Sequence, residues 1–362
     1  MAVLSNRAAN RATLDRQLLL RRADLGVLDA VEHLVGLQAQ APFPPYTGLW
    51  TRLTGFRPPD LADRLLDRSV VRIALMRGTV HLVSSADCLA LRPLHQDMLE
   101  RVVRTAHRKP LDGLDFADLA EFGRALVEEK PRSTAELGTL LLQRWPDRDR
   151  LAMLNVIRSA LPLVQLPPRA VWGRSGQTTV TTAQRWLDRP LCTDSTLDDL
   201  VRRYLAAFGP ASVADAQKWS GLTRLGEVFD RIRPELITFQ AENGTELFDL
   251  PDAPRPGPDP DAPVRFLPEF DNILLAYADP SRIMPPGHKA QLFTVNGIIR
   301  AALLVDGQTA GKWQINKSTL TVEPFRRLSA KDKSAIEEEG LKLLSFTEPE
   351  VAAPAVRIPD PF

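Results

Sequence analysis

The sequence predicts an α+β fold that is mainly helical and built from repeated blocks. At 362 residues the chain is long enough for two or three domains of ordinary size. Apolar residues make up 44% of it and charged residues 25%, which is globular composition and argues against disorder. Segments with helical spacing of apolar residues give way three times to short β-rich runs. We therefore expect several helical blocks, each closed by a hairpin.

The first block, residues 1–110, contains three helical segments and then two strands. Apolar residues recur at helical spacing over Ala12–Leu20, Leu25–Leu37 and Asp60–Leu66. Two β-rich runs follow, Val70–Met76 and Thr79–Val83, on either side of the turn Arg77-Gly78. Three helices closed by a two-stranded wing are typical of a winged helix.

This order recurs in residues 111–192 and 193–250. In the second block we expect helices at Leu114–Glu129, after the cap Ser133 and at Arg150–Ala160, then strands at Leu163–Leu166 and Val180–Thr182. In the third we expect helices at Leu197–Phe208, Val213–Trp219 and Leu222–Ile232, then strands at Leu236–Gln240 and Glu246–Leu250. The turn Ser220-Gly221 gives the third block a helix-turn-helix signature. Three tandem winged helices are predicted.

The remaining residues, 251–362, differ in character. Residues 251–263 are rich in proline and are expected to form a linker or long loop. A β-rich region is expected at Val264–Ala276, Gly297–Val305, Gln308–Ile315 and Thr319–Pro324, with Asp306-Gly307 at a hairpin tip. A final helix is expected at Ala330–Leu344.

The charge is unevenly distributed. The chain carries +1 overall, but residues 1–110 hold sixteen basic against ten acidic residues. A basic first block is compatible with phosphate binding, although exposed helix faces rich in arginine would give the same tally. Repeated winged helices favour contact with nucleic acid, and protein scaffolding stays open because a fold does not fix a function.

Several kinds of site are not expected. No apolar run approaches the length of a membrane span, so a cytoplasmic protein is predicted. Cys88 and Cys192 have no partner at ligand spacing, and the histidines form no metal-binding pattern, so no metal or other cofactor is expected. Phosphate-binding glycine loops and the Gly-x-Ser-x-Gly elbow are also missing.

Two uncharged amides stand out near the N-terminus. Gln38 and Gln40 lie where an apolar helix is expected to give way to a Pro-rich turn. By itself the pair is typical of two solvated amides that finish a helix. Its surroundings make it a candidate active site.

Those surroundings resemble a known family. The similarity is carried by Arg11–Gln17, Val35–Gln40, Tyr46–Trp50, Val71-Arg72, Arg77–Val83 and Phe266–Leu275. The chain resembles the AlkZ-like branch of DNA glycosylases, which is related to YcaQ and belongs to the bacterial winged-helix DNA-binding-domain family. The resemblance implies a C-shaped, positively charged channel for double-stranded DNA. It also implies excision of N7-alkylated purines and unhooking of interstrand crosslinks left by natural products such as azinomycin, a form of antibiotic self-resistance.

The resemblance maps the catalytic Gln-x-Gln of that branch onto Gln38 and Gln40. The sister branch has Asp at the second position, so Gln40 favours the AlkZ-like assignment. An N7-alkylated purine already carries positive charge and leaves as a neutral base, so no general acid is needed. A glutamine can hold the attacking water and a sugar or phosphate oxygen. We expect Gln40 to orient the water and Gln38 to fix Gln40 or the sugar.

Weaker predictions concern DNA contacts. The candidates are Arg72, Arg77, Thr79, His81, Lys312, Asn316 and Lys317. The two arginines flank the first wing, where phosphate pairing and simple solvation are equally open. For His81 a DNA contact and a hydrogen-bonded strand histidine are equally open. The hairpin at Asp306-Gly307 is a candidate for insertion into DNA, and Asp271 is expected to be structural.

Two functions from other classes remain as alternatives. A winged-helix transcriptional regulator would bind undamaged DNA tightly and sequence-specifically, whereas a protein scaffold would lack a continuous basic channel. For the glycosylase we expect a monomer that acts by water attack and leaves an abasic site. A lyase reaction through a Schiff base is not expected, because Lys109 is the only lysine in residues 1–110.

Overall fold

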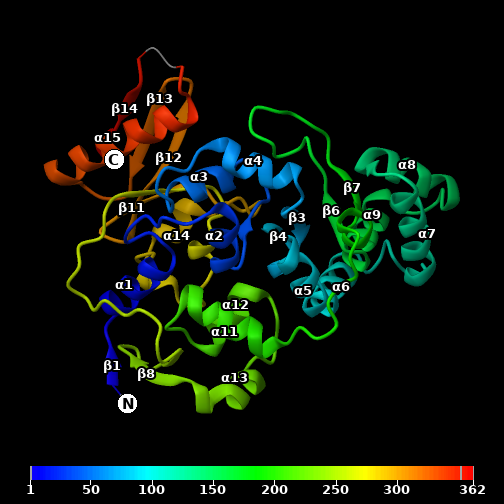
Figure 1. Ribbon diagram of the computed structural model, residues 1–362, viewed down its shortest axis with the longest axis horizontal. Coiled ribbons are helices and arrows are strands. Elements are labelled where there is room, and N and C mark those ends of the chain that lie inside the picture. Colours follow the sequence, from blue (N-terminus) through cyan, green and yellow to red (C-terminus); the bar gives the residue numbers. More distant parts are fainter. Residues whose placement is uncertain (1, 351–352, 362) are drawn as a thin grey trace.

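The computed structural model describes residues 2–350 and 353–361, and its elements are both helical and extended. Three sheets organise the strands (Figure 1). One has three strands in the order β1-β8-β9, another five in the order β10-β11-β12-β13-β14, and the largest six in the order β2-β4-β3-β6-β7-β5. The predicted mixture of helices and sheets is confirmed, while the winged-helix description of each block stays an interpretation.

The first block contains more helices than predicted. Its elements are β1 (Ala2–Leu4), α1 (Asn6–Arg16), α2 (Val27–His33), β2 (Leu37–Gln38), α3 (Pro44–Trp50), α4 (Pro58–Leu66), β3 (Val70–Ala74), β4 (Val80–Ser84), α5 (Ser85–Leu94) and α6 (Gln96–Ala106). The strands β3 and β4 form the predicted hairpin around Met76–Gly78. The Pro-rich segment after Gln40 is not only a turn, because Pro44 and Pro45 occupy the first positions of α3, where proline is tolerated.

The second and third blocks follow the predicted order closely. The second contains α7 (Phe116–Glu129), β5 (Arg132–Ser133), α8 (Thr134–Arg144), α9 (Arg150–Ala160), β6 (Leu163–Gln165), β7 (Thr179–Thr182) and α10 (Ala183–Leu187). The third contains α11 (Leu197–Phe208), α12 (Val213–Ser220), α13 (Gly226–Ile232), β8 (Ile237–Ala241) and β9 (Glu246–Asp249). In both, three helices precede an antiparallel strand pair.

The hairpins of the first two blocks join into one sheet. Strand β3 pairs antiparallel with β6, with Arg72 opposite Gln165 and Ile73 opposite Val164. On its other side β3 pairs with β4, which in turn carries β2. The helices α7, α8 and α9 lie at one end of the molecule in Figure 1, beyond this shared sheet.

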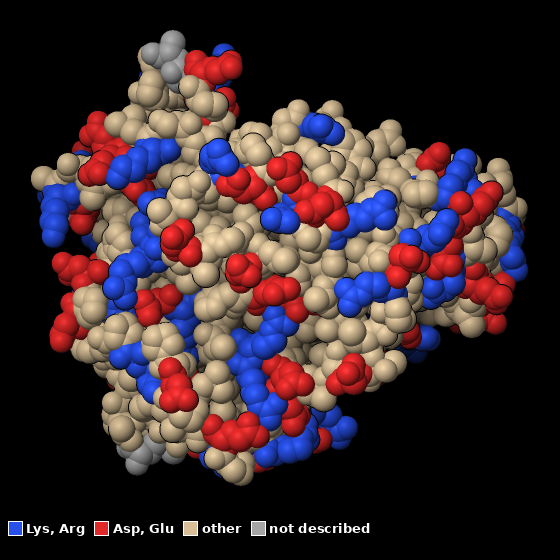
Figure 2. All heavy atoms as spheres, viewed as in Figure 1, with Lys and Arg blue, Asp and Glu red and all other residues tan. Residues whose placement is uncertain are grey.

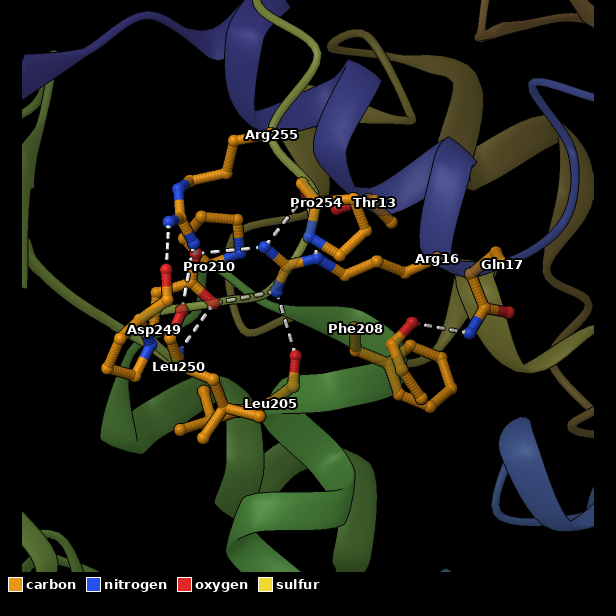
Figure 3. Close-up of polar contacts among 12 residues, drawn as sticks. Thr13, Arg16, Gln17, Leu205, Phe208, Pro210, Asp249, Leu250, Pro254 and Arg255 are labelled. Carbon is orange, nitrogen blue, oxygen red and sulfur yellow. Dashed lines mark hydrogen bonds and ion pairs between the residues drawn. The ribbon is translucent and has the colours of Figure 1, made fainter. Parts of the chain in front are cut away.

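The third block packs on the first through buried polar contacts. The Arg16 guanidinium at the end of α1 binds both carboxylate oxygens of Asp249 on β9, at 2.7 and 2.9 Å (Figure 3). It also donates to the carbonyl of Leu205 on α11 at 2.9 Å. Gln17 donates to the carbonyl of Ala207 at 2.7 Å. A shared apolar core, which includes Leu14 of α1, surrounds these contacts.

The C-terminal region packs against the first block. It contains β10 (Arg265–Leu267), η3 (Asn272–Leu274), η4 (Pro280–Arg282), α14 (His288–Leu292), β11 (Ala302–Val305), β12 (Gln308–Asn316), β13 (Thr319–Pro324), α15 (Ala330–Thr347) and β14 (Ala355–Arg357). The long strand expected at Val264–Ala276 is therefore only β10, followed by a turn of 3₁₀ helix. Residues 251–263 form a long loop whose carbonyls at Pro254, Pro258 and Pro260 accept hydrogen bonds from arginines of α1.

Among the described helices, none has the length and apolar character that a bilayer crossing requires.

Candidate active site

Gln38 lies on a strand, so its prediction at the end of a helix was wrong. Helix α2 stops at His33, and Val35 and Gly36 then adopt positive φ angles of 53° and 86°. A Cβ atom on Gly36 would lie 2.6 Å from Cγ1 of Val83 and 2.9 Å from the carbonyl oxygen of Leu82. Only glycine allows this close approach, which turns the chain into β2 beside β4. Gln38 then pairs with His81.

The two glutamines lie at one edge of the six-stranded sheet, on β2 and directly after it. Ala39 continues the pairing, because its N–H donates to the carbonyl of Val80 at 2.7 Å. Ala39 is fully buried. Gln40 follows in a bend, and its side chain accepts a hydrogen bond from Val80 as well. Each amide is therefore held by the hairpin of β3 and β4.

Each glutamine has a defined amide orientation. Gln38 is buried, and its Oε1 accepts a hydrogen bond from Nη2 of Arg77 at 2.8 Å. Gln40 is exposed, and its Oε1 accepts from the backbone N–H of Val80 at 3.3 Å. A guanidinium and a backbone N–H can only donate, so the atom facing each of them must be the amide oxygen. The NH₂ group of Gln38 has no hydrogen-bond partner among the residues that the structure describes.

Arg77 points into the protein rather than towards phosphates. Its guanidinium donates to Gln38, to the carbonyl of Trp219 and, at 3.0 Å, to Oδ1 of Asn272. Burial lowers the pKa of Arg77 to about 10, which still leaves it charged at neutral pH. Neither of the two predicted roles, a phosphate contact or a solvated charge, describes this placement.

His81 is a hydrogen-bonded strand histidine, one of the two alternatives predicted for it. It is fully buried, and Nδ1 lies 3.0 Å from the carbonyl oxygen of Thr79, so Nδ1 carries the proton. Nε2 faces Nη2 of Arg77 at 3.4 Å. Burial, and next the charge of Arg77, hold the pKa of His81 well below its usual value. His81 is therefore neutral, and its buried ring offers no surface for a DNA contact.

The expectation of an exposed Arg72 on the wing was also wrong. Its side chain is 1% exposed, and Nη2 donates to the carbonyl of Ala39 at 2.7 Å. Burial, and next the charge of Arg169, lower the pKa of Arg72 to about 10. Arg72 thus supports the backbone between the two glutamines from the inside of the sheet, where DNA does not reach it. The half-buried Thr79 donates to the carbonyl of Met76 at 3.1 Å, and a DNA contact by Thr79 stays a prediction.

The hairpin tip at Asp306-Gly307 is packed against α1. The Asp306 carboxylate pairs with Arg7 at 2.6 Å and also with Arg11. A Cβ atom on Gly307 would lie 2.5 Å from Oδ1 of Asn10. Because Gly307 is buried against α1 and the Asp306 carboxylate is paired with two of its arginines, the structure contradicts the suggested insertion of this tip into DNA.

A different hairpin of the same sheet is exposed. Strands β12 and β13 turn at Asn316 and Lys317, both exposed, and Lys317 has a positive φ of 52°. Lys312 lies further down β12, half-buried, with its Nζ 2.7 Å from a carboxylate oxygen of Glu323. Of the three polar residues predicted to contact DNA here, Asn316 and Lys317 are exposed at the turn, whereas the charge of Lys312 is already paired with Glu323.

The motif around Asp271 contributes a residue to the candidate site that the sequence did not identify. Asp271 is structural, as expected, because it accepts hydrogen bonds from Arg52 at 2.8 and 2.9 Å inside the core. Its neighbour Asn272 is buried and joins the site, since it accepts from Arg77 and donates to the carbonyl of Gly36 at 3.1 Å. Sequence reasoning weighed only the carboxylate of this motif, and the adjacent amide was the missed signal.

The charge tally of the first block overstates its surface charge. Five of its arginines have almost fully buried side chains, namely Arg11, Arg16, Arg52, Arg72 and Arg92. On the face shown in Figure 2, basic and acidic side chains alternate without forming a continuous basic stripe. Much of the excess positive charge in residues 1–110 therefore lies inside the protein, where it cannot bind phosphate.

Two buried histidines near the site make the stability of the protein sensitive to acid. Burial, and next the charge of Arg92, lower the pKa of His95 to about 4, and that of His81 is also depressed. The unfolded chain binds protons at these residues below pH about 6.5, whereas the folded protein does not. We expect the free energy of unfolding to fall by about 1.4 kcal/mol per pH unit and per histidine below that pH.

Urea unfolding between about pH 7 and about pH 5 checks this prediction, because most carboxylates stay ionised over that range. The variant His95→Gln should show a shallower fall than the wild type. Equal stability at both ends of the range would mean that the two histidines are protonated in the folded state.

Comparison with known proteins supports the resemblance drawn from the sequence. The family model for DNA glycosylase AlkZ-like proteins matches residues 31–346. The interstrand DNA cross-link repair glycosylase of Streptomyces sahachiroi is 24% identical over 355 residues, which cover 90% of this chain and 92% of that relative. The solved structure of Streptomyces sahachiroi DNA glycosylase AlkZ is similar with a TM-score of 0.83 and 22% identity, over 99% of this chain and 100% of that one. At this identity the structural match establishes a shared fold.

Proposed function

Because the chain belongs to the AlkZ-like family of DNA glycosylases, we propose that it excises N7-alkylated purines from double-stranded DNA and unhooks interstrand crosslinks formed through them. A relative of nearly the same length is named for the repair of interstrand crosslinks. Family membership does not favour a transcriptional regulator without catalysis or a scaffold. We expect the enzyme to act as a monomer in the cytoplasm and without a cofactor.

The chemistry proposed for the site is hydrolysis at C1′. The oxygen of a water molecule forms a bond to C1′, and the bond from C1′ to N9 of the purine breaks. The electron pair of that bond goes to the base, where it cancels the positive charge of the alkylated ring, and a water proton passes to solvent. An undamaged purine lacks this charge and would leave poorly, so selectivity for alkylated bases follows from the absence of an acid.

The observation that carries this proposal is the pair of amides at the β2 edge of the sheet, where no ionisable side chain of the described residues is hydrogen-bonded to Gln40. Gln40 is exposed and keeps one lone pair of its Oε1 free, because Val80 uses only the other. That oxygen can accept a hydrogen bond from the attacking water. The NH₂ of Gln38 can hold an oxygen of the sugar or phosphate. Positioning of this kind can lower the barrier by several kcal/mol.

The decisive experiment incubates the protein with duplex DNA that carries N7-alkylguanine, followed by alkaline cleavage at abasic sites. We expect strand breaks at the lesion above the non-enzymatic background, and none in the same duplex without the lesion. The double variant Gln38→Ala/Gln40→Ala measures the background of the preparation. Breaks no more frequent with the wild type than with this variant would rule out the proposed activity.

The exposed hairpin of β12 and β13 is proposed to contact the DNA backbone through Asn316 and Lys317. Lys317→Ala should weaken binding to undamaged duplexes of any sequence and reduce the slope of log affinity against log salt concentration by about one. Lys312→Ala is the matched control, since Glu323 already neutralises that charge. Titrations at several salt concentrations check this, and equal slopes for both variants would place the hairpin away from the phosphates.

A further inference from the structure

Arg77 occupies a position in the fold that an ordinary surface arginine would not. It lies in the tight turn between β3 and β4 with a positive φ of 58°, a conformation that costs energy for any residue other than glycine. The turn after α12 presses on it, because a Cβ atom on Gly221 would lie 2.9 Å from Cα of Arg77. The third block thus holds the backbone of this residue from outside the hairpin.

The guanidinium of Arg77 connects three separate parts of the chain. It donates to Oε1 of Gln38 on β2 at 2.8 Å and to Oδ1 of Asn272 at 3.0 Å. Its other terminal nitrogen donates to the carbonyl of Trp219 on α12. Asn272 in turn donates to the carbonyl of Gly36, two residues before Gln38. The hydrogen bonds therefore run from the backbone just before β2, at Gly36, through Asn272 and Arg77 to the side chain of Gln38 on β2.

This arrangement determines which end of the Gln38 amide faces the substrate. A free glutamine amide can present either its oxygen or its NH₂ group, because a half-turn about its last torsion exchanges the two. With Arg77 in place, the oxygen is held inward by a charged donor, and hydrogen bonds to charged groups are the stronger ones. The NH₂ group of Gln38 is therefore turned away from Arg77, while the exposed Gln40 keeps a free acceptor lone pair.

We propose that Arg77 is a positioning residue for the glycosylase reaction, which it serves by fixing the Gln38 amide with its NH₂ group towards the DNA. This inference rests on the proposed function. It assigns the two glutamines distinct tasks: Gln38 donates to a sugar or phosphate oxygen of the damaged nucleotide, and Gln40 accepts from the attacking water. It also gives the turn after α12 a part in the site, through the carbonyl of Trp219.

The test is a cycle of four proteins: wild type, Arg77→Lys, Gln38→Ala and the double variant. Lysine keeps the charge but cannot donate from two nitrogens in a fork. In single-turnover base release from N7-alkylguanine DNA, Arg77→Lys should lower the rate about 10- to 100-fold, the scale expected when a catalytic group is misplaced. Affinity for the same DNA and its salt dependence should not change. In the Gln38→Ala background, Arg77→Lys should have almost no further effect.

The matched control is Arg132→Lys on β5, an arginine that also donates to a backbone carbonyl, that of Leu126, at the far edge of the same sheet. It should release base at the wild-type rate. If Arg77→Lys does not fold, Asn272→Ala takes its place in the cycle, since it removes one acceptor of Arg77 and the link to Gly36. Asn272→Ala should then lower the rate of base release in the wild-type background and have almost no further effect in the Gln38→Ala background.

Three outcomes would overturn the inference. Equal rate losses with and without Gln38 would show that Arg77 acts by another route, and a lower affinity with a salt slope reduced by about one would make it a phosphate contact. The unfolding free energies of the four proteins give a readout independent of activity. Additive changes in those free energies would show that the two side chains do not interact. If the wild type releases no base but the unfolding free energies are non-additive, the proposed function is refuted. The hydrogen bond between Arg77 and Gln38 is then still supported.

Discussion

Replacing Gln40 by alanine should lower the single-turnover rate of base release from N7-alkylguanine DNA about 100-fold. The substitution removes an exposed amide oxygen that keeps a free lone pair for the attacking water. Without that acceptor the water is no longer held in the orientation that the attack requires. Because Gln40 is exposed, truncation should change the free energy of unfolding by no more than about 0.5 kcal/mol. A slow but fully stable enzyme is the expected result.

The control for this variant is Gln240→Ala, which removes another exposed glutamine at the end of a different strand pair. It should retain both the rate and the stability of the wild type. Gln38→Ala should also be slow, but it leaves Arg77 with one acceptor fewer and is therefore the less clean variant. If Gln40→Ala releases base as fast as the wild type, Gln40 does not hold the water.

The helices that the sequence predicted well are those with strong signals at both ends. The second helix of the second block begins where Ser133 and Glu136 form the predicted capping box. Arg150–Ala160 and Leu197–Phe208 have the bounds that were expected from their apolar spacing. Caps and apolar spacing depend only on residues within one or two helical turns, so they can be read directly from the sequence.

The strand β2 was missed because its cause is not local. The apolar spacing continues from α2 through Leu37 and favours a helix over the whole stretch. What stops the helix is the contact of Gly36 with Val83 and the vacant edge of β4, which lie more than forty residues further on. The Gln-x-Gln pattern was therefore recognised as a pair, but its position on and directly after a strand depends on these distant contacts.

The rest of the candidate site depends on still more distant contacts. Arg77 meets Trp219 and Asn272 across 142 and 195 residues of sequence. Nothing near the turn Arg77-Gly78 indicates that its guanidinium faces the protein interior, so the sequence left only phosphate pairing and solvation open. The count of basic residues in 1–110 also includes Arg16 and Arg52, and both are buried against carboxylates.

One of these buried pairs joins the first and third blocks. Asp249 on β9 has no exposed side-chain surface, and both of its oxygens bind Arg16 of α1 (Figure 3). Arg255, from the Pro-rich loop, adds a third ion-pair contact at 2.7 Å. The carboxylate therefore connects α1, β9 and the loop at one point, and the two guanidinium groups depend on it for compensation of their charge.

Asp249→Ala should lower the free energy of unfolding by about 3–5 kcal/mol, because it leaves Arg16 buried without its counter-charge. Urea denaturation with an unchanged m-value would measure this loss. The matched control is Asp118→Ala, which breaks the exposed pair with Arg144 and should cost about 1 kcal/mol or less. Equal losses for the two variants would show that the pair with Arg16 does not hold the blocks together. A large loss for Asp249→Ala alone, with a single transition, would mean that the first and third blocks unfold as one unit, as their shared core requires.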